Sequence, residues 1–340
     1  VKGKTEPIIA HTGSGVTDEV RLGGTATRLY CRRAELVVLS RAIGELGEIV
    51  DIVGAAGVGK SRLLDAAWDE AEGLRAFHGA CTPYGATSPY SVFRPLLRGG
   101  LGIDIHADPV SVGEELSAFV ADAAPHLVPM LPLLAVPFGA DVPSTPEVDA
   151  IDAEFRRQRI HEAVVDLYDT TLGSTPVFLV IEDLHWVDDA SGDLVNHLVR
   201  AAADRPWAGV TTRRPEGAWE MDAGQSHVTP MLLEPLSADD VRGLAIEVSD
   251  RALSDAELDI VVGRANGNPL FAVELARAVS QDAGAVPDSV ESLIASRVDA
   301  LPPGARRLVR VAAVLGTTFS ERDLQLVLEP QAGDRPASSG

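Results

Sequence analysis

A short apolar run, a glycine-rich turn and an amphipathic segment follow one another between residues 48 and 64 of this 340-residue chain. Gly54, Gly59, Lys60 and Ser61 match the pattern G-x-x-x-x-G-K-[ST]. Glycines at these positions let the backbone curl until successive N–H groups point at a bound phosphate, and the following helix presents its positive end to the anion. The motif therefore predicts a phosphate-binding loop between a buried strand and a helix.

The predicted loop gives its side chains distinct roles. Lys60 is expected to reach the β- and γ-phosphates, and the Ser61 hydroxyl is expected to ligate Mg²⁺. The other two lysines of the chain are Lys2 and Lys4, so Lys60 is the only lysine in its body. An ordinary glycine-rich turn is the alternative interpretation, and the strand and helix patterns on either side disfavour it. The residues expected to contact the nucleotide are Gly54, Ala55, Ala56, Gly57, Val58, Gly59, Lys60, Ser61 and Arg62.

Composition limits the classes of function. A formal net charge of −21 and the lack of a basic run argue against a nucleic-acid surface, so we expect negligible affinity for DNA or RNA. The two cysteines form no C-x-x-C pair, and a reducing cytoplasm is the default location. No signal peptide opens the chain and no segment is apolar for long enough to span a bilayer, so no membrane partner is expected.

Apolar runs predict five strands, and the continuous run at 177–181 is typical of a strand that is buried on both faces of a parallel sheet. Helical periodicity separates the runs, with helices expected at 32–46, 61–72 and 150–172 and a long, mostly helical insertion between 83 and 146. This alternation predicts a doubly wound α/β domain, which binds ligands at the carboxyl ends of its strands. The expected strands are 49–53, 74–80, 177–181, 207–211 and 228–232.

The pattern becomes purely helical after residue 236. Ser237, Ser254 and Pro269 are expected to start helices that end near 248, 264 and 279. Further helices are expected at 288–299 and 303–315, with part of another at 319–328. The predicted organisation is a linker at 1–24, a nucleotide-binding domain at 25–234, a helical domain at 235–285, a further domain start at 286–330 and a disordered tail at 331–340.

An acidic pair marks the second half of the predicted site. A phosphate loop needs a carboxylate for Mg²⁺ and a group that orients the attacking water, and both usually come from the end of a neighbouring buried strand. Glu182 and Asp183 stand at that place. A helix cap or a solvated turn is the alternative interpretation of such a pair. His185 lies close by, and the sequence is equally compatible with an orienting role and with simple packing.

Two arginines follow the fourth expected strand, at the same sheet edge as the phosphates. Arg214 is the candidate sensor of the γ-phosphate, and the sequence does not decide between it and Arg213. Solvation of both arginines at the surface is the alternative interpretation.

Taken together, these motifs resemble the STAND class of signal-transduction ATPases, which is related to the AAA ATPases. Within that class they are similar to modules of large LuxR-type regulators and of actinobacterial class III adenylate/guanylate cyclases. The resemblance covers about residues 28 to 330. The matching stretches are GVGKSRL at 57–63, VIEDLHWVD at 180–188, TRRP at 212–215, LEPLS at 233–237, GNPLF at 267–271 and AAVLG at 312–316, with Phe319 after it.

The resemblance implies a P-loop NTPase fold with a parallel five-stranded sheet, an all-helical lid domain and the start of a winged-helix-like domain. It implies that Glu182 and Asp183 are the Walker B acids, with Glu182 on the Mg²⁺ side beside Ser61 and Asp183 orienting water. Arg214 resembles the sensor arginine, and Pro269 resembles the lid proline that touches adenine in the closed, ADP-bound state.

Two stretches depart from the family pattern. Cys31, Arg32 and Arg33 stand where Gly-Arg-Glu is usual, which leaves the adenine-side contacts open. Ala55 replaces the acidic residue that is common in the loop.

The implied function is an ATP/ADP switch with slow Mg²⁺-dependent hydrolysis that regulates an attached output domain, a cyclase or a transcription regulator, with nucleotide-dependent oligomerisation. Residues 1–7 resemble the close of a class III cyclase domain, so 1–24 are interpreted as the tail of one whose active site is absent here. A P-loop kinase or other small-molecule transferase is one alternative, and a non-hydrolysing nucleotide-binding scaffold is another.

Overall fold

The computed structural model describes residues 29–68, 74–83, 88–217, 219–222, 224–281, 295, 298 and 301–315. The described residues up to 281 belong to one compact unit, and helix α13 (Pro303–Leu315), which matches its predicted bounds, belongs to a second. The predictions for 1–24, 319–328 and 331–340 lie outside the described residues, as does nearly all of the helix expected at 288–299. The domain boundaries remain predictions.

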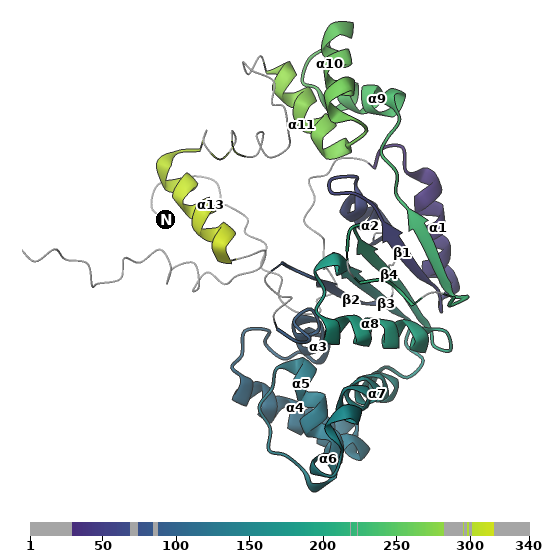
Figure 1. Cartoon of the computed structure of the whole chain (residues 1–340), viewed down its shortest axis with the longest axis vertical. Helices are drawn as coiled ribbons and strands as arrows, with labels where there is room; N and C mark the ends of the chain where they lie inside the picture. Colours follow the sequence, from purple (N-terminus) through teal and green to yellow (C-terminus); the bar gives the residue numbers. More distant parts are fainter. Residues whose placement is uncertain are drawn as a thin grey trace, which may run out of the picture. The chain divides into compact units, whose positions relative to one another are not determined.

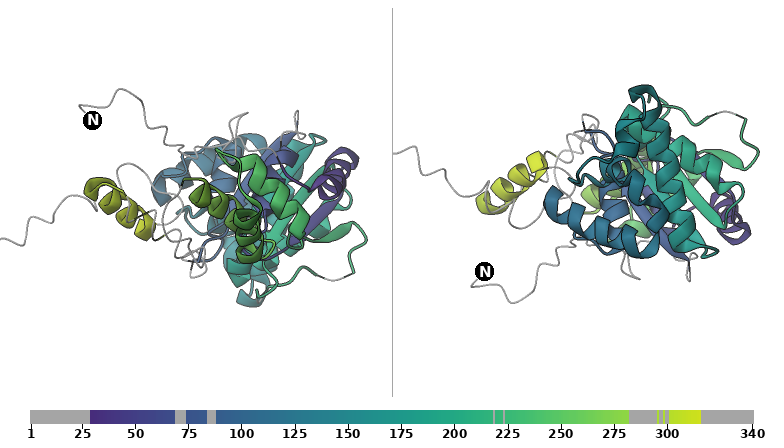
Figure 2. Two further views of the ribbon diagram at one scale, coloured as in Figure 1. Left: turned by 90° about the horizontal axis from the view of Figure 1, so that it is seen from above. Right: turned by 90° about the horizontal axis from the view of Figure 1, so that it is seen from below.

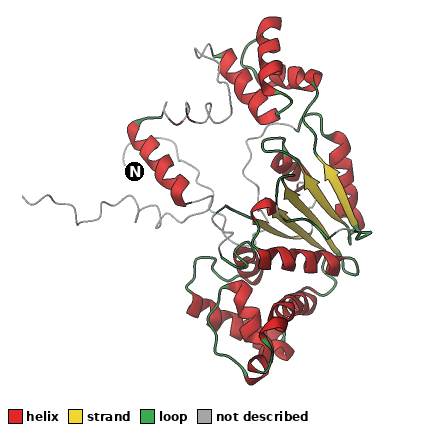
Figure 3. Ribbon diagram, in the orientation of Figure 1, coloured by secondary structure: helices red, strands yellow, loops and turns green. Residues whose placement is uncertain are grey.

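The first unit is built on a sheet of five parallel strands, as predicted (Figure 1, Figure 3). The strand order is β2-β3-β4-β1-β5. Val53 at the end of β1 pairs with Arg213 of β4, and Ile181 of β3 pairs with Thr211 of β4, so these strands deliver their last residues to one sheet edge. The strands are β1 (Ile49–Val53), β2 (Arg75–Ala80), β3 (Val177–Glu182), β4 (Trp207–Arg213) and β5 (Val228–Leu232).

Strand β4 runs two residues beyond the predicted range, which ended at the first polar side chains. Thr211 and Thr212 are nevertheless buried, because each hydroxyl makes a hydrogen bond. Thr211 Oγ1 donates to Asp51 of β1 over 2.9 Å, and Thr212 Oγ1 accepts from the backbone N–H of Asp183 over 3.0 Å. Arg213 therefore lies within the strand and not, as the sequence suggested, in the turn that follows it.

Helices cover both faces of the sheet and bury a separate hydrophobic cluster on each (Figure 2). On one face, α1 (Arg33–Glu45) and α2 (Lys60–Trp68) pack on side chains such as Val50, Ile52 and Phe178. On the other face, α3 (Phe93–Leu101), α7 (Ala153–Leu172) and α8 (Asp189–Ala202) pack on Phe77 and Ile181. This is the doubly wound arrangement that the alternating pattern predicts.

The segment between β2 and β3 is largely helical, as expected. Its further elements are α4 (Pro109–Ala123), the 3₁₀ helix η2 (Pro125–Met130), α5 (Leu131–Phe138) and α6 (Pro146–Asp149). Arg98 of α3 is buried there, and its guanidinium donates to the carbonyl groups of Phe138, Gly139, Ile105 and Ala107, which satisfies its charge and ties α3 to the loops around it. Within the described part of the chain, no helix combines the length and apolarity needed to cross a bilayer.

Three further helices follow β5 and pack against one another: α9 (Ala238–Val248), α10 (Asp255–Ala265) and α11 (Pro269–Ser280). We call them the three-helix unit. Ser237 and Ser254 cap the first two, as predicted, and Ser254 forms a capping box with Glu257. Asn268 caps the third, since its Oδ1 accepts from the backbone N–H of Phe271 over 3.1 Å.

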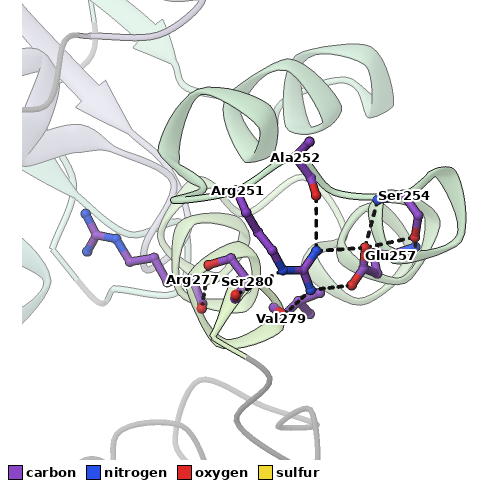
Figure 4. Close-up of polar contacts among 7 residues, drawn as sticks. All are labelled: Arg251, Ala252, Ser254, Glu257, Arg277, Val279 and Ser280. Carbon is purple, nitrogen blue, oxygen red and sulfur yellow. Dashed lines mark hydrogen bonds and ion pairs between the residues drawn. The ribbon is translucent and has the colours of Figure 1, made fainter.

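Arg251 links the start of α10 to the end of α11 through hydrogen bonds and an ion pair (Figure 4). Its guanidinium donates to the carbonyl groups of Val279 and Ser280 at the end of α11, and it forms an ion pair with Glu257 over 2.7 Å. Arg277 contributes only its carbonyl oxygen, which accepts from Ser280, and its guanidinium points away from this cluster in Figure 4.

Candidate nucleotide-binding site

The glycine-rich loop joins β1 to α2 as predicted, and its backbone requires glycine. Gly57 and Gly59 have φ values of +74° and +103°, in the left-handed region that side chains disfavour. Gly54 has an ordinary φ but no room, because a Cβ there would lie 2.9 Å from Val58 and 3.0 Å from the Leu233 carbonyl oxygen. Strand β1 supplies the rigid side of the loop, and α2 begins directly at Lys60.

Lys60 is folded back over its own loop. The residue is 8% exposed, and its Nζ donates to the carbonyl oxygens of Gly54 and Ala55 over 2.7 Å and 3.0 Å. Burial lowers the pKa of Lys60, the carboxylates of Asp183 and Glu182 oppose this, and the Arg214 guanidinium adds to it. The ammonium group is therefore held by two charge-assisted hydrogen bonds to carbonyl groups of the loop.

Ser61 and Glu182 meet across the gap between α2 and β3. Ser61 Oγ donates to Glu182 Oε2 over 2.8 Å, and Nε2 of His78 on β2 lies 2.9 Å from Glu182 Oε1. Burial raises the pKa of Glu182, but the hydrogen bonds to His78 and Ser61 outweigh burial and lower it overall. The carboxylate is therefore ionised and oriented, with one oxygen turned toward the loop.

A hydroxyl and a carboxylate at this distance are the oxygen ligands that Mg²⁺ prefers. The residues present therefore fit the predicted metal, and Ser61 and Glu182 stay its predicted protein ligands. Among the described side chains, no cluster of three His, Cys, Asp or Glu residues forms a further metal site.

His78 is a site residue that the sequence analysis missed. Residues 78 and 80 of β2 pair with Val180 and Glu182 of β3, so His78 is a diagonal neighbour of Glu182 on the same sheet face. The register of the two strands decides this contact, and neither strand's residue pattern specifies it. A histidine in an edge strand of a predicted phosphate-loop sheet was the only available signal.

Asp183 turns the chain away from the sheet. It has φ of +58° and leads into the 3₁₀ turn η3 (Leu184–Trp186). Thr212 of β4 fixes this turn by accepting the Asp183 N–H, while the Asp183 carboxylate keeps 46% exposure. Strands β3 and β4 thus hold Asp183 beside Glu182, with its carboxylate facing out of the sheet edge.

The two arginines after Thr212 differ in their surroundings. Arg213 Nε lies 3.0 Å from Oδ2 of Asp51, whose side chain is 3% exposed in the middle of β1, so Arg213 is committed to a buried ion pair. The Arg214 side chain forms no hydrogen bond or ion pair with another described residue. Arg214 directly follows β4, and its charge contributes to lowering the pKa of Lys60 and the pKa of His185.

The three-helix unit touches the phosphate loop directly. Asn268 Nδ2 donates to the carbonyl of Ala56 over 3.0 Å, and the N–H of Leu270 lies 3.4 Å from the carbonyl oxygen of Gly57. The Pro269 ring lies 3.8 Å from the place where a Gly59 Cβ would stand. Pro269 thus lies beside the loop, and its contact with adenine stays a prediction. Asn268 is a second residue at the loop, and the sequence analysis treated it only as part of a turn.

A cleft opens between the loop and the three-helix unit, with about 830 Å³ of empty space that includes open solvent. Sites for small organic ligands are typically lined by apolar side chains with a few polar groups among them. Apolar side chains predominate in its wall, and the charged ones include Arg62, Glu274 and Arg277. Its apolar lining includes Leu29, Leu236, Leu244, Pro269, Leu270 and Val273.

The stretch that departs from the family pattern lies at this cleft. Tyr30 and Arg32 line it, and Arg32 forms an ion pair with Glu35 over 2.9 Å and donates to the carbonyl of Val58 over 3.4 Å. Cys31 has φ of +53°, in the left-handed region that favours glycine, at the position where the family pattern usually has glycine. Arg32 therefore links the stretch before α1 to the phosphate loop by a hydrogen bond.

Comparison with known proteins gives a family match. The family model described as AAA ATPase domain matches residues 28–209. A curated relative, an uncharacterised protein of Rhizobium meliloti (strain 1021), is 31% identical over 296 residues, which is 80% of this chain and 28% of that protein. The chain thus spans little more than a quarter of the length of this relative.

Solved structures with a similar fold are more distant. A STAND protein with a tetratricopeptide repeat sensor from Pyrococcus horikoshii is 14% identical, with a TM-score of 0.47 over 87% of this chain and 36% of that one. A Walker-type ATPase of Pyrococcus abyssi is 14% identical, with a TM-score of 0.41 over 92% of this chain and 91% of that one. Since the family model covers more than half of the chain and includes the glycine-rich loop, Glu182, Asp183 and most of the sheet, the chain belongs to the AAA ATPase domain family of P-loop ATPases.

Proposed function

We propose that this protein is an ATP/ADP switch, in which nucleotide exchange and slow hydrolysis control how the three-helix unit sits on the phosphate loop. The observation that carries the proposal is the pair of hydrogen bonds from Asn268 and Leu270 to carbonyl groups of the loop. A loop that rearranges around phosphates would change these bonds directly. Nucleotide state and the position of the three-helix unit are then coupled without an intermediate element.

In this proposal the phosphates lie on the loop and the nucleoside lies in the cleft. Lys60 leaves the carbonyl groups of Gly54 and Ala55 and turns to the β- and γ-phosphates, and the loop N–H groups and the start of α2 hold the rest of the anion. The main chain and side chains from Gly54 to Arg62 form the phosphate side. Pro269 contacts the base in the ADP-bound state.

Ser61 and Glu182 hold the Mg²⁺ of the nucleotide, and the metal, when bound, neutralises charge on the β- and γ-phosphate oxygens. Glu182 is prepared for this role, because His78 fixes one of its oxygens and leaves the other facing Ser61. Asp183, the more exposed carboxylate, orients the attacking water.

Arg214 and Pro269 supply the difference between the two nucleotides. A ligand shifts an equilibrium between two states only by its difference in affinity for them. Arg214 contacts the γ-phosphate, which ADP lacks, and Pro269 favours the ADP-bound arrangement from the three-helix unit. The switch acts in the cytoplasm on an output domain in the same longer protein, a cyclase or a transcription regulator, and its ATP-bound form self-associates.

Removing the charge of Asp183 should impair ATP turnover, whereas removing the charge of Glu182 should impair ATP binding. We expect Asp183→Asn to keep Mg-ATP bound but to lower turnover by about 10²-fold, because the water loses its orienting carboxylate. Glu182→Gln should instead weaken Mg²⁺-dependent binding of ATP, because Ser61 then has no anionic partner for the metal. ATP titrations at several Mg²⁺ concentrations and phosphate-release rates check both, and the opposite pattern would show that the two roles are exchanged.

The most direct test of the proposal is to identify the nucleotide that co-purifies with the protein and to follow its exchange. We expect ADP or ATP in the denatured protein, and small-angle scattering curves that differ between the ATP-bound and ADP-bound forms. A protein that binds both nucleotides with one affinity and one scattering curve is not a switch of this kind.

A further inference from the structure

The cleft beside the phosphate loop has one carboxylate in its wall. Glu274 of α11 lines the cleft, and the residue is 9% exposed. Among the described residues that line the cleft, no other is Asp or Glu, whereas three are arginines. Arginines are favourable beside a polyphosphate, but a carboxylate repels it. The place of Glu274 in this wall therefore needs an explanation other than phosphate binding.

Helix α11 begins at the phosphate loop and carries Glu274 away from it. At its first turn, the N–H of Leu270 lies 3.4 Å from the carbonyl oxygen of Gly57. Glu274 comes five residues after Pro269, which is about 7.5 Å further along the helix axis. Since the loop holds the phosphates, the part of the nucleotide that meets Glu274 is the nucleoside. The residues of α11 that line the cleft share one helix face, and they are Pro269, Leu270, Val273, Glu274 and Arg277.

The chemistry of a carboxylate favours the sugar over the base as its partner. An ionised carboxylate only accepts hydrogen bonds, so its partner must be a donor. The ribose of a nucleotide presents two hydroxyl donors, on its 2′ and 3′ carbons. The base is largely flat and apolar on its faces, and side chains such as Leu236 and Leu244 give the cleft an apolar wall for it. Carboxylate side chains bind ribose hydroxyls in this way in dinucleotide-binding folds.

Arg277 holds the Glu274 carboxylate by charge. Its Nη1 lies 3.7 Å from Oε1 of Glu274, a distance that makes an ion pair but is longer than a hydrogen bond. This pair offsets part of the cost of burying the charge. A carboxylate has about four acceptor positions, so Glu274 can accept hydrogen bonds from a ligand while the ion pair persists.

We infer that Glu274 binds the ribose of the nucleotide, accepts hydrogen bonds from its hydroxyl groups, and thereby selects ribonucleotides over deoxyribonucleotides. The inference rests on the proposed function, which places the nucleoside in this cleft, and it adds the residue that sets sugar specificity. A deoxynucleotide would leave the carboxylate facing a C–H group in a partly apolar wall, and buried polar groups without partners are costly.

The first test needs no substitution. In the 340-residue chain we expect 2′-deoxy-ADP, 3′-deoxy-ADP or both to have a dissociation constant about 10- to 10²-fold higher than that of ADP, because a hydrogen bond to a charged group is lost. Calorimetric titration of the three nucleotides measures these constants under one set of conditions.

Two substitutions then assign the preference to Glu274. Glu274→Met keeps an unbranched side chain of similar length without an acceptor, so the deoxy-ADP to ADP ratio of dissociation constants should fall to within about twofold of one. Glu274→Gln keeps a neutral amide oxygen and should give an intermediate ratio. A ratio taken within one protein cancels any loss that all nucleotides share, so a merely structural role of Glu274 would not change it.

Glu45→Met is the matched control, because it makes the same change in α1 on a side chain that is 58% exposed. It should keep the ratio of the parent.

The outcomes that overturn the inference are distinct from failure of the proposed function. If the parent binds ADP and both deoxy analogues equally, or if Glu274→Met keeps the parent's ratio, the inference is wrong and the proposed switch stands. If Glu274→Met changes the ratio between ADP and GDP but not that between ADP and its deoxy analogues, Glu274 contacts the base and the inference is again wrong. If the parent binds neither ADP nor ATP, the inference and the proposed function are both wrong.

Discussion

Lys60→Ala is expected to raise the dissociation constant for ATP by at least about 10²-fold while leaving the protein folded, because it removes the loop's only side-chain ammonium from a poorly solvated phosphate site. The fold should survive, since Lys60 makes hydrogen bonds only to the carbonyls of Gly54 and Ala55. We expect the free energy of unfolding to fall by no more than about 1.5 kcal/mol. Fluorescence titration with a labelled nucleotide and urea unfolding measure the two quantities.

Arg41→Ala is the matched control, because it removes one positive charge from a side chain of α1 that is 54% exposed. It should leave nucleotide affinity unchanged. If Lys60→Ala retained the affinity of the parent, the phosphate loop would not be the binding site.

Arg213→Ala and Arg214→Ala should change the free energy of unfolding by very different amounts, although the two residues are adjacent. Arg213→Ala leaves the buried carboxylate of Asp51 without its ion partner, so we expect a loss of about 3 kcal/mol in the free energy of unfolding. Arg214→Ala removes no contact with a described residue and should change stability by less than about 0.5 kcal/mol. Chemical unfolding of the two variants side by side measures this difference.

The nucleotide affinities should show the reverse order. We expect Arg214→Ala to bind ATP and ADP with similar affinity, because one charged contact with the γ-phosphate contributes about 1.5–3 kcal/mol. Arg213→Ala, measured well below its melting temperature, should still prefer the nucleotide that the parent prefers. If Arg213→Ala lost the discrimination and Arg214→Ala kept it, Arg213 would be the sensor and its pairing with Asp51 would have to break when ATP binds.

The sheet and the loop could be predicted because burial in a parallel sheet leaves a clear mark on sequence. The run at 177–181 and the spacing of Gly54, Gly59, Lys60 and Ser61 specify a local structure without reference to any distant residue. The caps at Ser237 and Ser254 could be predicted for the same reason, since a capping side chain bonds to the backbone three residues away.

What could not be predicted depends on contacts between distant segments. His78 meets Glu182 through the register of two strands that are about a hundred residues apart in sequence, and the residue pattern does not set that register. The predicted range of strand β4 stops at Thr211 because polar residues follow, although the Thr212 hydroxyl is satisfied by the Asp183 N–H and the strand continues to Arg213. Among the described residues, neither ring nitrogen of His185 has a hydrogen-bond partner, and this property of its surroundings has no counterpart in sequence.

Gly57 stands where the phosphate loop meets the three-helix unit, and this has a consequence for how the family can vary. Its φ of +74° already favours glycine, and a Cβ at that position would lie 2.8 Å from both terminal atoms of the Asn268 side chain. Two separate constraints therefore favour glycine at position 57. One is the backbone conformation of the loop, and the other is the close contact with Asn268, the cap of α11, which lies more than two hundred residues later in the chain. A lineage that lost helices α9–α11 would be released from the second constraint only, so we expect positions 57 and 268 to be inherited as a pair wherever those helices are retained.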